Sequence, residues 1–397
     1  MGTRSFDLVI YGATGFTGRQ AARYLDRTNP PGLRWAIAGR SREKLEDLRK
    51  RLGTPEVGLI IADASDPASL RSMAEATTAV VSTVGPFRRY GTPLVEACID
   101  AQTHYADITG ETPWVRGLID RLEDKAKTRG VRLVPFSGYD SMPSDLGTFA
   151  IAEHTRASRG VGLRRVEAFH SARGGFNGGT LATLLDSVQE GRLIFDPWLL
   201  SPGFVPTQAA RSLDRDPREV RYHERARTWT APFVMSMINT RVVRRSAALF
   251  SAQGQPYGAD FAYQEYWGTR SRLSAYAVLG TVGLLGATVQ TSAGRSLVEM
   301  IGPKPGEGPS EEAMDAGRFT CRYLAEAEDG SIVSATMRGI GDPGNRSTVR
   351  FLIEAGILLS ETPIAPEHGG FLTPATAFGR RILERCAAHG LSFALDT

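Results

Sequence analysis

The residues best suited to chemistry are glycines close to the N-terminus. Gly12, Gly15 and Gly18 recur at intervals of three residues, after the apolar run 6–11 and before a helical pattern at 19–27. A strand, a glycine turn and a helix in this order let the backbone approach a pyrophosphate, which free N–H groups at the helix start then bind. The full context makes the pattern more specific than glycines by themselves. It predicts a dinucleotide-binding loop consisting of Gly12-Ala13-Thr14-Gly15-Phe16-Thr17-Gly18.

The end of the second expected strand indicates which dinucleotide the loop binds. An NAD site needs an acidic residue about 20 residues after the glycines, where it binds the ribose 2′-hydroxyl. Here that position holds Arg40, which is followed by Ser41 and Lys44. A guanidinium matches a 2′-phosphate through two parallel hydrogen bonds, and Ser41 and Lys44 add donors. These residues predict NADPH, and the alternative is that Arg40 is only an exposed cation beside Glu43.

Two further segments are expected to contact the cofactor. Asp63 follows the third expected strand, where it either accepts a hydrogen bond from the adenine amino group or is simply a polar strand end. After the fourth strand, small residues and a proline stand where the chain must pass the nicotinamide ribose. A plain strand terminator is the alternative for this segment, which consists of Thr83-Val84-Gly85-Pro86.

Alternating strands and helices surround these residues. Strands are expected at 35–38, 57–61, 79–83, 105–108 and 131–135, with helices at 42–52, 93–101 and 112–129. Such alternation with short loops is typical of a parallel, doubly wound α/β sheet, so we expect an N-terminal Rossmann domain over residues 1–150.

A second domain is expected after residue 150. The pattern changes there to long alternating strands that carry arginine, at 163–173, 261–269, 319–326 and 332–340. They predict an α+β domain with a mostly antiparallel sheet over 151–371. A chain of 397 residues is long enough for two such cores.

Composition excludes several classes of protein. A formal net charge of +4 is too weak to indicate nucleic-acid binding. The widely spaced Cys98, Cys321 and Cys386 contain no CxxC pair and fit a reducing compartment. No secretion signal precedes the first strand, so a cytoplasmic location is expected. The histidines lack metal-site spacing, and no Gly-x-Ser-x-Gly motif occurs, so neither a metal nor hydrolysis is expected.

An uncharged segment at 273–294 has the length of a membrane span. Gly280, Gly283 and Gly286 recur within it at intervals of three residues, which suits close packing on another helix. A buried or dimer-forming helix is therefore favoured. Two alternatives stay open: a helix that faces lipid or an acyl substrate at the inner face of a membrane, and a true membrane span.

As an ordered set, several motifs resemble the saccharopine-dehydrogenase-like reductases, and more closely their trans-acting enoyl reductase branch. The resemblance covers nearly the whole chain and depends on Tyr11-Gly12-Ala13-Thr14-Gly15-Phe16-Thr17-Gly18, Ala38-Gly39-Arg40-Ser41, Val84-Gly85-Pro86-Phe87, Tyr105-Ala106-Asp107-Ile108-Thr109-Gly110-Glu111, Gly138-Tyr139-Asp140-Ser141-Met142-Pro143-Ser144-Asp145 and Leu372-Thr373-Pro374-Ala375-Thr376-Ala377.

This resemblance implies a fold, a cofactor and a reaction. The α+β domain would interrupt the Rossmann domain, and the C-terminal segment 372–397, with a helix near Pro374 to His389, would return to it. The implied cofactor is NADPH. The implied reaction is hydride delivery to the β-carbon of an α,β-unsaturated acyl thioester, held on a polyketide synthase in lipid synthesis.

The segment 138–145 follows the last Rossmann strand, at the edge of the sheet where ligands bind. Tyr139 is the candidate catalytic residue, because its hydroxyl could donate a proton to the enolate or α-carbon. The alternative is that Ser144 and Asp145 cap the following helix while Tyr139 packs at a domain boundary. Asp107 and Glu111, near the same edge, either position substrate or accept hydrogen bonds from loop amides, and the second is favoured.

Two other functions compete with enoyl reduction. Saccharopine-type amino-acid chemistry involves a substrate with several carboxylates and would need clustered arginines in the second domain. Arg173, Arg241, Arg244 and Arg245 leave this open. The third hypothesis is a non-catalytic NADP-binding scaffold that uses 273–294 as its anchor on a membrane or lipid droplet.

Overall fold

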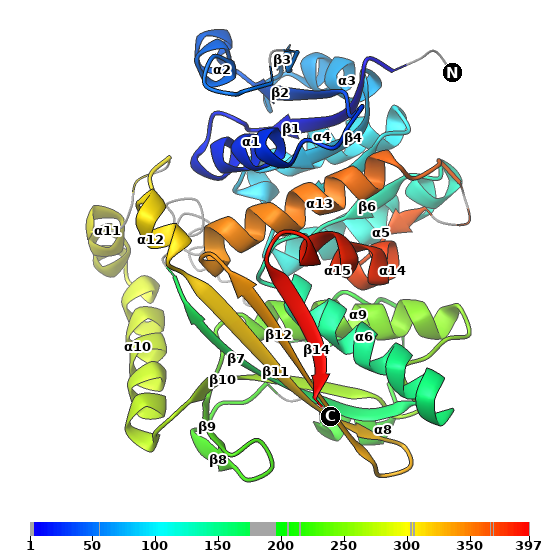
Figure 1. Ribbon diagram of the computed structural model, residues 1–397, viewed down its shortest axis with the longest axis vertical. Coiled ribbons are helices and arrows are strands. Elements are labelled where there is room, and N and C mark those ends of the chain that lie inside the picture. Colours follow the sequence, from blue (N-terminus) through cyan, green and yellow to red (C-terminus); the bar gives the residue numbers. More distant parts are fainter. Residues whose placement is uncertain are drawn as a thin grey trace.

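Two sheets, one above the other, organise the computed structural model (Figure 1). The upper sheet contains the N-terminal strands, and the lower sheet contains those of the second half of the chain. The structure describes residues 4–54, 56–174, 196–204, 206–213, 216–301, 304, 306–365, 367 and 369–396.

The upper sheet is a parallel Rossmann sheet, as expected. Its strand order is β13-β6-β5-β4-β1-β2-β3, and every pairing is parallel. The strands are β1 (Phe6–Tyr11), β2 (Trp35–Gly39), β3 (Gly58–Ile61), β4 (Thr77–Ser82), β5 (His104–Asp107), β6 (Arg132–Val134) and β13 (Gly370–Phe371).

Helices cover both faces of this sheet, which is why its strands are apolar on both sides. Leu8 and Ile10 face α1 (Phe16–Thr28), α2 (Arg42–Arg49) and α13 (Thr348–Ser360). Val9 and Tyr11 face the opposite layer, made of α3 (Pro67–Glu75), α4 (Phe87–Asp100) and α5 (Thr112–Thr128). Alternate side chains of one strand therefore anchor two helical layers.

The lower sheet is mixed, with one parallel pair between β7 and β10 and antiparallel pairs elsewhere. Its order is β14-β12-β11-β7-β10-β9-β8. The strands are β7 (Leu163–Arg173), β8 (Arg221–His223), β9 (Thr228–Ala231), β10 (Ala262–Thr269), β11 (Arg318–Ala327), β12 (Ile332–Ile340) and β14 (Leu391–Asp396).

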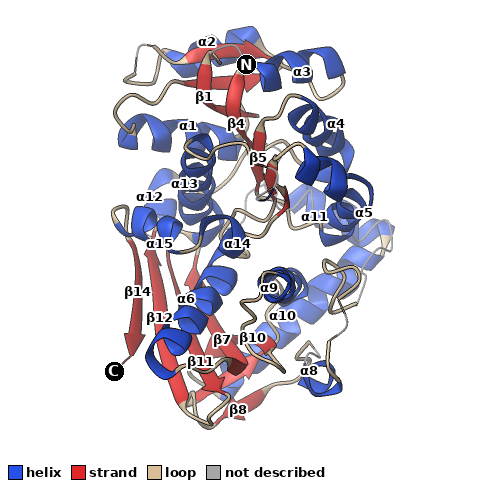
Figure 2. Cartoon of the chain, turned by 90° about the vertical axis from the view of Figure 1, so that its right-hand side faces the viewer, coloured by secondary structure: helices blue, strands red, loops and turns tan. Residues whose placement is uncertain are grey.

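The helices of the second half lie around this lower sheet. Figure 2 shows α6 and α9 between the two sheets. The helices are α6 (Met142–Arg159), α8 (Gln208–Leu213), α9 (Ser236–Ala252), α10 (Arg272–Gln290), α11 (Ser292–Ile301), α12 (Glu311–Asp315), α14 (Pro374–Phe378) and α15 (Arg380–Ala387), with the turn η1 (Pro343–Ser347) before α13.

The chain returns to the Rossmann domain earlier than the segment 372–397. Helix α13 already packs on β1, β4 and β5, and Gly356 has no side chain that would separate it from Val81 and Leu8. The short strand β13 then extends the upper sheet. Helices α14 and α15 follow and contact α13, but the last strand, β14, pairs with β12 in the lower sheet. The chain therefore passes between the two domains more than once.

The segment 273–294 is not a buried helix of this chain. It forms α10 and the start of α11, and of its most apolar 18 residues only 11% are buried. By length and apolar composition α10 is the one helix among the described residues that could cross a membrane. Figure 1 shows it along one side of the lower sheet, outside the layers that cover the two sheets.

Candidate functional site

The glycine loop lies where β1 ends and α1 begins. Gly12 has a φ of +85°, and a Cβ there would collide with Val84 and Thr83 from the end of β4. A Cβ at Gly18 would collide with the Gly12 carbonyl oxygen. At Gly15, by contrast, a Cβ would find only the Gly12 oxygen, at 3.3 Å. Two glycines therefore close the turn, and the third leaves space on its exposed side.

The first turn of α1 is suited to an anion. Gly15 is its N-cap residue and provides no side-chain cap, and no acidic residue occurs in this turn. The first N–H groups of a helix have no partner within the helix, and its dipole favours negative charge there. The remaining loop residues follow this turn: Ala13 is buried with its N–H bound to the Ala38 carbonyl, while Thr14, Phe16 and Thr17 are half-buried. A pyrophosphate fits this arrangement.

Arg40 stands exposed at the end of β2 and has no hydrogen-bond partner among the described residues. Next to it, the Ser41 hydroxyl accepts the Lys44 N–H at 3.4 Å and caps α2. Asp63 lies close by: burial and then the Asp63 carboxylate raise the pKa of Tyr11 to about 12, while Arg40 acts in the opposite direction. The fold thus brings Arg40, Ser41, Lys44 and Asp63 to one corner of the sheet. A 2′-phosphate there would meet the free guanidinium.

The loop after β4 meets the glycine loop directly. The Thr83 hydroxyl donates to the carbonyls of Tyr11 and Gly12, at 3.2 and 3.3 Å. Val84 packs beside Gly12, and Gly85–Pro86 then leads into α4. Helix α4 therefore begins at Phe87, earlier than the expected 93–101, and includes Pro93. The segment Thr83 to Pro86 lies at the same sheet edge as the glycine loop, as the sequence predicts.

Asp107 and Glu111 accept hydrogen bonds from loop amides. The Glu111 carboxylate receives the N–H groups of Phe87 and Arg88, at 2.7 and 2.9 Å. Its negative charge therefore lies at the positive end of the α4 dipole. The same contacts connect the loop after β5 to the loop after β4. Asp107 receives the Thr109 N–H at 3.0 Å, and burial raises its pKa to about 7. The favoured interpretation of these residues is confirmed.

Tyr139 follows β6 and packs at the domain boundary. Its ring lies 4.8 Å from that of Phe319 on β11, and its N–H donates to the Thr348 hydroxyl at 3.2 Å. The side chain is 6% exposed, and its hydroxyl has no hydrogen-bond partner among the described residues. Burial, with Cys321 and Asp140 nearby, raises the pKa of Tyr139 well above its usual value. The phenol therefore keeps its proton at neutral pH.

The next residue, Asp140, belongs to the segment 138–145, and the sequence alone assigns it no role. It is half-buried, and burial raises the pKa of its carboxyl to about 6. None of the described residues pairs with this carboxyl. It therefore combines partial exposure with a readily bound proton, at the edge where the strands of the Rossmann sheet end. The only sequence signal for it is its position directly after β6 and Tyr139.

Ser144 and Asp145 do not cap α6, contrary to the alternative considered for them. Asp145 accepts the Ala375 N–H at 2.7 Å and the Ser246 hydroxyl. The Ser144 hydroxyl donates to Glu265 at 2.7 Å. Both side chains therefore fix the start of α6 to elements far away in the sequence.

Glu265 is the centre of a buried polar network. Its carboxylate accepts from Ser144, from the Tyr263 hydroxyl at 2.9 Å and from the Asn239 amide at 2.8 Å, and it lies 3.3 Å from His170 Nε2. Burial lowers the pKa of His170, but Cys321 and Glu265 outweigh it and raise that pKa to about 10. The imidazolium–carboxylate pair joins β7 and β10 of the lower sheet to α6 and α9.

The second-domain arginines do not form an open cluster for carboxylates. Arg241 lies 2.7 Å from Asp216, Arg244 donates to the Tyr263 carbonyl at 3.0 Å, and Arg245 donates to the Leu200 carbonyl at 2.5 Å. All three are buried along α9. Only Arg173 is exposed, at the end of β7. Sequence spacing could not distinguish such internal arginines from ligand-binding ones.

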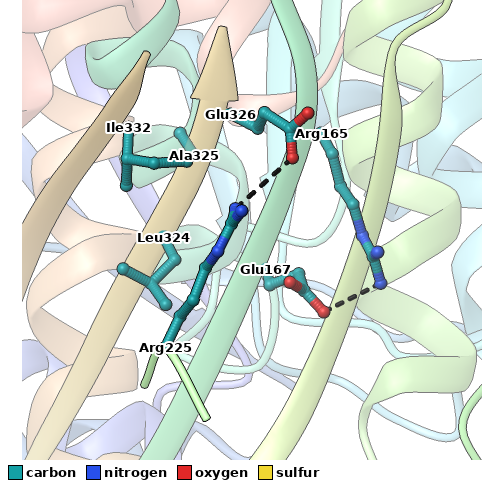
Figure 3. A pocket seen from close by; sticks show the side chains of 7 residues that line it. All are labelled: Arg165, Glu167, Arg225, Leu324, Ala325, Glu326 and Ile332. Carbon is teal, nitrogen blue, oxygen red and sulfur yellow. Dashed lines mark hydrogen bonds and ion pairs between the residues drawn. The ribbon is translucent and has the colours of Figure 1, made fainter. Parts of the chain in front are cut away.

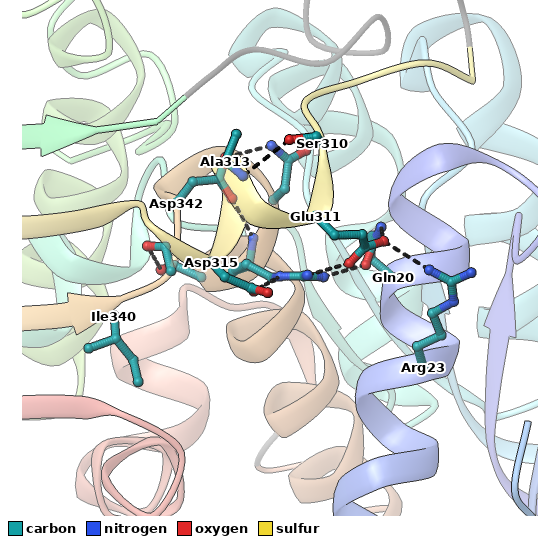
Figure 4. A network of polar contacts seen from close by, with 12 residues as sticks. Gln20, Arg23, Ser310, Glu311, Ala313, Asp315, Ile340 and Asp342 are labelled. Atoms are coloured by element: carbon teal, nitrogen blue, oxygen red, sulfur yellow. Dashed lines mark hydrogen bonds and ion pairs between the residues drawn. The ribbon is translucent and has the colours of Figure 1, made fainter.

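A polar network connects the segment around α12 to α1 (Figure 4). Arg346 binds Asp315 at 2.8 Å and also Glu311, while Glu311 accepts from Arg23 on α1 at 2.9 Å. Gly308 lies directly against the Phe16 ring. The residues around Gly308 and Glu311 are therefore attached to the glycine loop and to α1.

The outer face of the lower sheet holds a small hollow (Figure 3). It is separate from the edge of the Rossmann sheet that carries the glycine loop. Arg165 pairs with Glu167 at 2.8 Å, and Arg225 points toward Glu326 at 3.6 Å. Such partly exposed ion pairs are typical of a solvated face. Among the described residues, no three His, Cys, Asp or Glu side chains gather as metal ligands would.

Comparison with known proteins agrees with this geometry. Residues 8–134 match the family model of the saccharopine dehydrogenase NADP binding domain. The chain is similar over its full length to saccharopine dehydrogenase (L-Glu forming) from Saccharomyces cerevisiae, with a TM-score of 0.55, 12% identity and coverage of 98% and 99% of the two chains. That likeness concerns the fold.

Closer relatives are mycobacterial. A trans-acting enoyl reductase from Mycobacterium bovis is 36% identical over 414 residues, covering 98% of this chain and 97% of the relative. One from Mycobacterium ulcerans is 34% identical over 427 residues, with the same coverage. The cofactor is NADPH and the protein is an NADPH-dependent oxidoreductase. The chain belongs to the saccharopine-dehydrogenase-like oxidoreductases, within the group of the trans-acting enoyl reductases.

Proposed function

We propose that this protein reduces the double bond of an α,β-unsaturated acyl thioester that a polyketide synthase carries, in the synthesis of a lipid. The mycobacterial relatives are named for enoyl reduction in trans. The structural observation that carries the proposal is the burial of Arg241, Arg244 and Arg245 among internal acceptors. A substrate with several carboxylates, as in saccharopine-type chemistry, would require such cations to be free.

Residues of this chain hold the cofactor for that reaction. The α1 N-terminus receives the pyrophosphate, Arg40 with Ser41 and Lys44 receives the 2′-phosphate, and Asp63 lies beside the adenine side of the site. The segment Thr83–Pro86 lines the nicotinamide end. NADPH, when bound, supplies the hydride that the β-carbon of the substrate accepts.

The reaction then needs a proton at the α-carbon, because hydride addition leaves an enolate of the thioester. Tyr139 is the donor that the sequence predicts, and its high pKa keeps the proton available. The structure favours Asp140 as a second candidate, since its half-buried carboxyl is more accessible than the enclosed phenol. Whichever group gives up its proton recovers one from solvent after the saturated thioester forms.

The reaction class is tested by mixing pure protein with NADPH and following the NADPH absorbance. A medium-chain enoyl thioester, saccharopine precursors and a blank are compared. Turnover with the enoyl thioester only is expected. Turnover with the saccharopine precursors would overturn the proposal, and NADPH binding without turnover on either substrate would favour the scaffold.

The proton donor is tested with Tyr139→Phe and Asp140→Asn. Tyr139→Phe removes a buried hydroxyl that has no partner among the described residues, so it should not destabilise the fold. The variant that lacks the true donor should lose about 10²–10⁴ in kcat while keeping its NADPH affinity. Full activity in both variants would exclude both residues.

A further inference from the structure

The outer surface of α10 is apolar and uncovered. Leu273 is 82% exposed, Leu284 71% and Tyr276 47%. These side chains, with Ala277 and Gly280, follow one another at helical spacing along the side of α10 that faces away from the lower sheet. A contiguous exposed apolar stripe of this kind marks an interaction surface.

Several polar groups at the ends and in the middle of α10 find partners within α10 and the start of α11. Ser271 and Ser274 form a capping box at its start, and the Thr281 hydroxyl donates to the Ala277 carbonyl at 2.9 Å. At the other end, Arg295 donates to the carbonyls of Val289 and Gln290, at 3.0 and 3.2 Å. Satisfied polar groups of this kind can be placed in an apolar medium without the loss of a hydrogen bond.

Aromatic and cationic side chains gather where α10 starts. The Arg272 guanidinium lies 5.8 Å from the Trp229 ring and 5.6 Å from the Tyr276 ring. Tyr222, 41% exposed, packs against Trp229 at 5.4 Å. Tryptophan, tyrosine and arginine are the side chains that concentrate at the boundary between lipid tails and headgroups.

The ionisable residues of α10 and of the chain directly before and after it all have one sign. Between Glu265 and Glu299 the only ionised side chains are those of Arg270, Arg272 and Arg295. Both ends of the apolar stripe are thus positive, and nothing acidic interrupts it. Such a surface is complementary to a membrane that carries anionic headgroups.

The attachment of α10 decides between lying on a bilayer and crossing it. Ala275 near its start and Val289 near its end are both buried, at 0% and 2% exposure. Helix α10 packs on β9 and β10 of the lower sheet and on the following helix α11. Because these contacts hold one side of α10 against the folded protein, the helix can offer only its outer stripe to lipid.

From these observations we propose that α10 docks the protein on an anionic membrane surface, lying in the plane of the interface with Leu273, Tyr276 and Leu284 inserted among the lipids. Among the alternatives for 273–294, this favours the lipid-facing helix. The inference rests on the surface of α10 alone and does not depend on the substrate proposed above.

The test is flotation of the full-length protein with vesicles of phosphatidylcholine, with and without phosphatidylglycerol. Binding is expected with the anionic vesicles and should weaken with salt. Leu284→Glu should lower it at least about tenfold, because an apolar side chain is replaced by a charge of the wrong sign. Arg270→Glu with Arg272→Glu should remove the preference for anionic lipid.

Two controls keep the outcome interpretable. Ile332→Glu introduces the same charge at a 43% exposed position on β12 and should leave flotation unchanged. Gly283→Leu adds an apolar side chain where nothing lies within 4 Å, so it should increase binding. NADPH binding by every variant shows that each has folded.

Three results would overturn the proposal. The first is the absence of flotation in the wild-type protein, and the second is equal flotation of wild type and Leu284→Glu. The third is a stable dimer by light scattering that Leu284→Glu dissociates while vesicle binding is absent, which would assign the stripe to a second copy of the chain.

Discussion

Helices α1 and α6 both begin just after a strand of the Rossmann sheet, yet their first turns differ completely. At α1, glycines expose the first N–H groups, with no side-chain cap and no acidic residue. At α6, Ser144 and Asp145 are fully buried and bound to Glu265, Ser246 and Ala375 of other elements.

The same topological position thus serves two purposes, and side chains decide between them. Glycine leaves room for a ligand, so the start of α1 is suited to the pyrophosphate of a cofactor. Buried carboxylates and hydroxyls occupy the equivalent space at α6 and join the two domains there. The loop that leads from β6 into α6 carries Tyr139, which is enclosed, and Asp140, which is half-buried.

Disrupting the buried network at the start of α6 should have the largest effect, and that effect should be on the stability of the protein. Glu265→Ala removes the acceptor for Ser144, Asn239 and Tyr263 and leaves the His170 charge buried without its carboxylate. Loss of one partner of such a pair costs about 3–5 kcal/mol. Chemical denaturation should show this loss. A change below about 1 kcal/mol would mean that the network does not hold α6 and α9 on the lower sheet.

Disrupting the glycine loop at the start of α1 should weaken NADPH binding and leave the stability of the protein unchanged. Gly15→Val introduces a side chain on the exposed side of the turn, where the pyrophosphate belongs, and should lower NADPH affinity at least about 100-fold with an unchanged melting temperature. Gly18→Val is the matched comparison. Its side chain would collide with the Gly12 carbonyl, so the protein itself should be destabilised. Undiminished NADPH titration by Gly15→Val would refute the loop assignment.

This contrast also explains what the sequence could predict. The cofactor side depends on neighbours in the chain: Gly12, Gly15 and Gly18 act through one turn, and Arg40 through its distance from them. The Rossmann strands follow the same logic, since an apolar run bounded by turns is a local signal. The strands and the glycine turn were therefore predicted with their residues, whereas the role of Arg40 stays a prediction.

The α6 side depends on partners that are far apart in the sequence. Ser144 meets Glu265 across 121 positions, and Asp145 meets Ala375 across 230. No local spacing reports such pairs. For the same reason the burial of Arg241 and the early return of the chain at α13 became visible only in three dimensions. The apolar run of α10 was predicted, but not which neighbours it lacks.

The difference between NADPH and NADH affinity tests the proposed cofactor site near α1 further. Arg40→Ala should cost about 1–3 kcal/mol of NADPH affinity and leave NADH affinity nearly unchanged, because only NADPH has the 2′-phosphate. Isothermal titration with both dinucleotides measures this difference. Lys44→Ala, a neighbouring change of the same charge, should cost less, since an exposed ammonium makes a weaker contact than a bidentate guanidinium. Equal losses for NADPH and NADH would sink the role given to Arg40.

The pH dependence of turnover distinguishes the enclosed Tyr139 from the half-buried Asp140 in the loop that leads into α6. Burial raises the pKa of Asp140 from its usual 3.8 to about 6, so its proton is present below that pH and is lost above it. If Asp140 donates, kcat/KM should fall by up to tenfold for each pH unit above about 6, and Asp140→Asn should abolish this limb with most of the activity. If Tyr139 donates, its raised pKa keeps the phenol protonated, so the rate should stay level across neutral pH. Tyr139→Phe should then be the inactive variant. A falling limb that persists in Asp140→Asn would show that another group titrates, and it would remove Asp140 from the reaction.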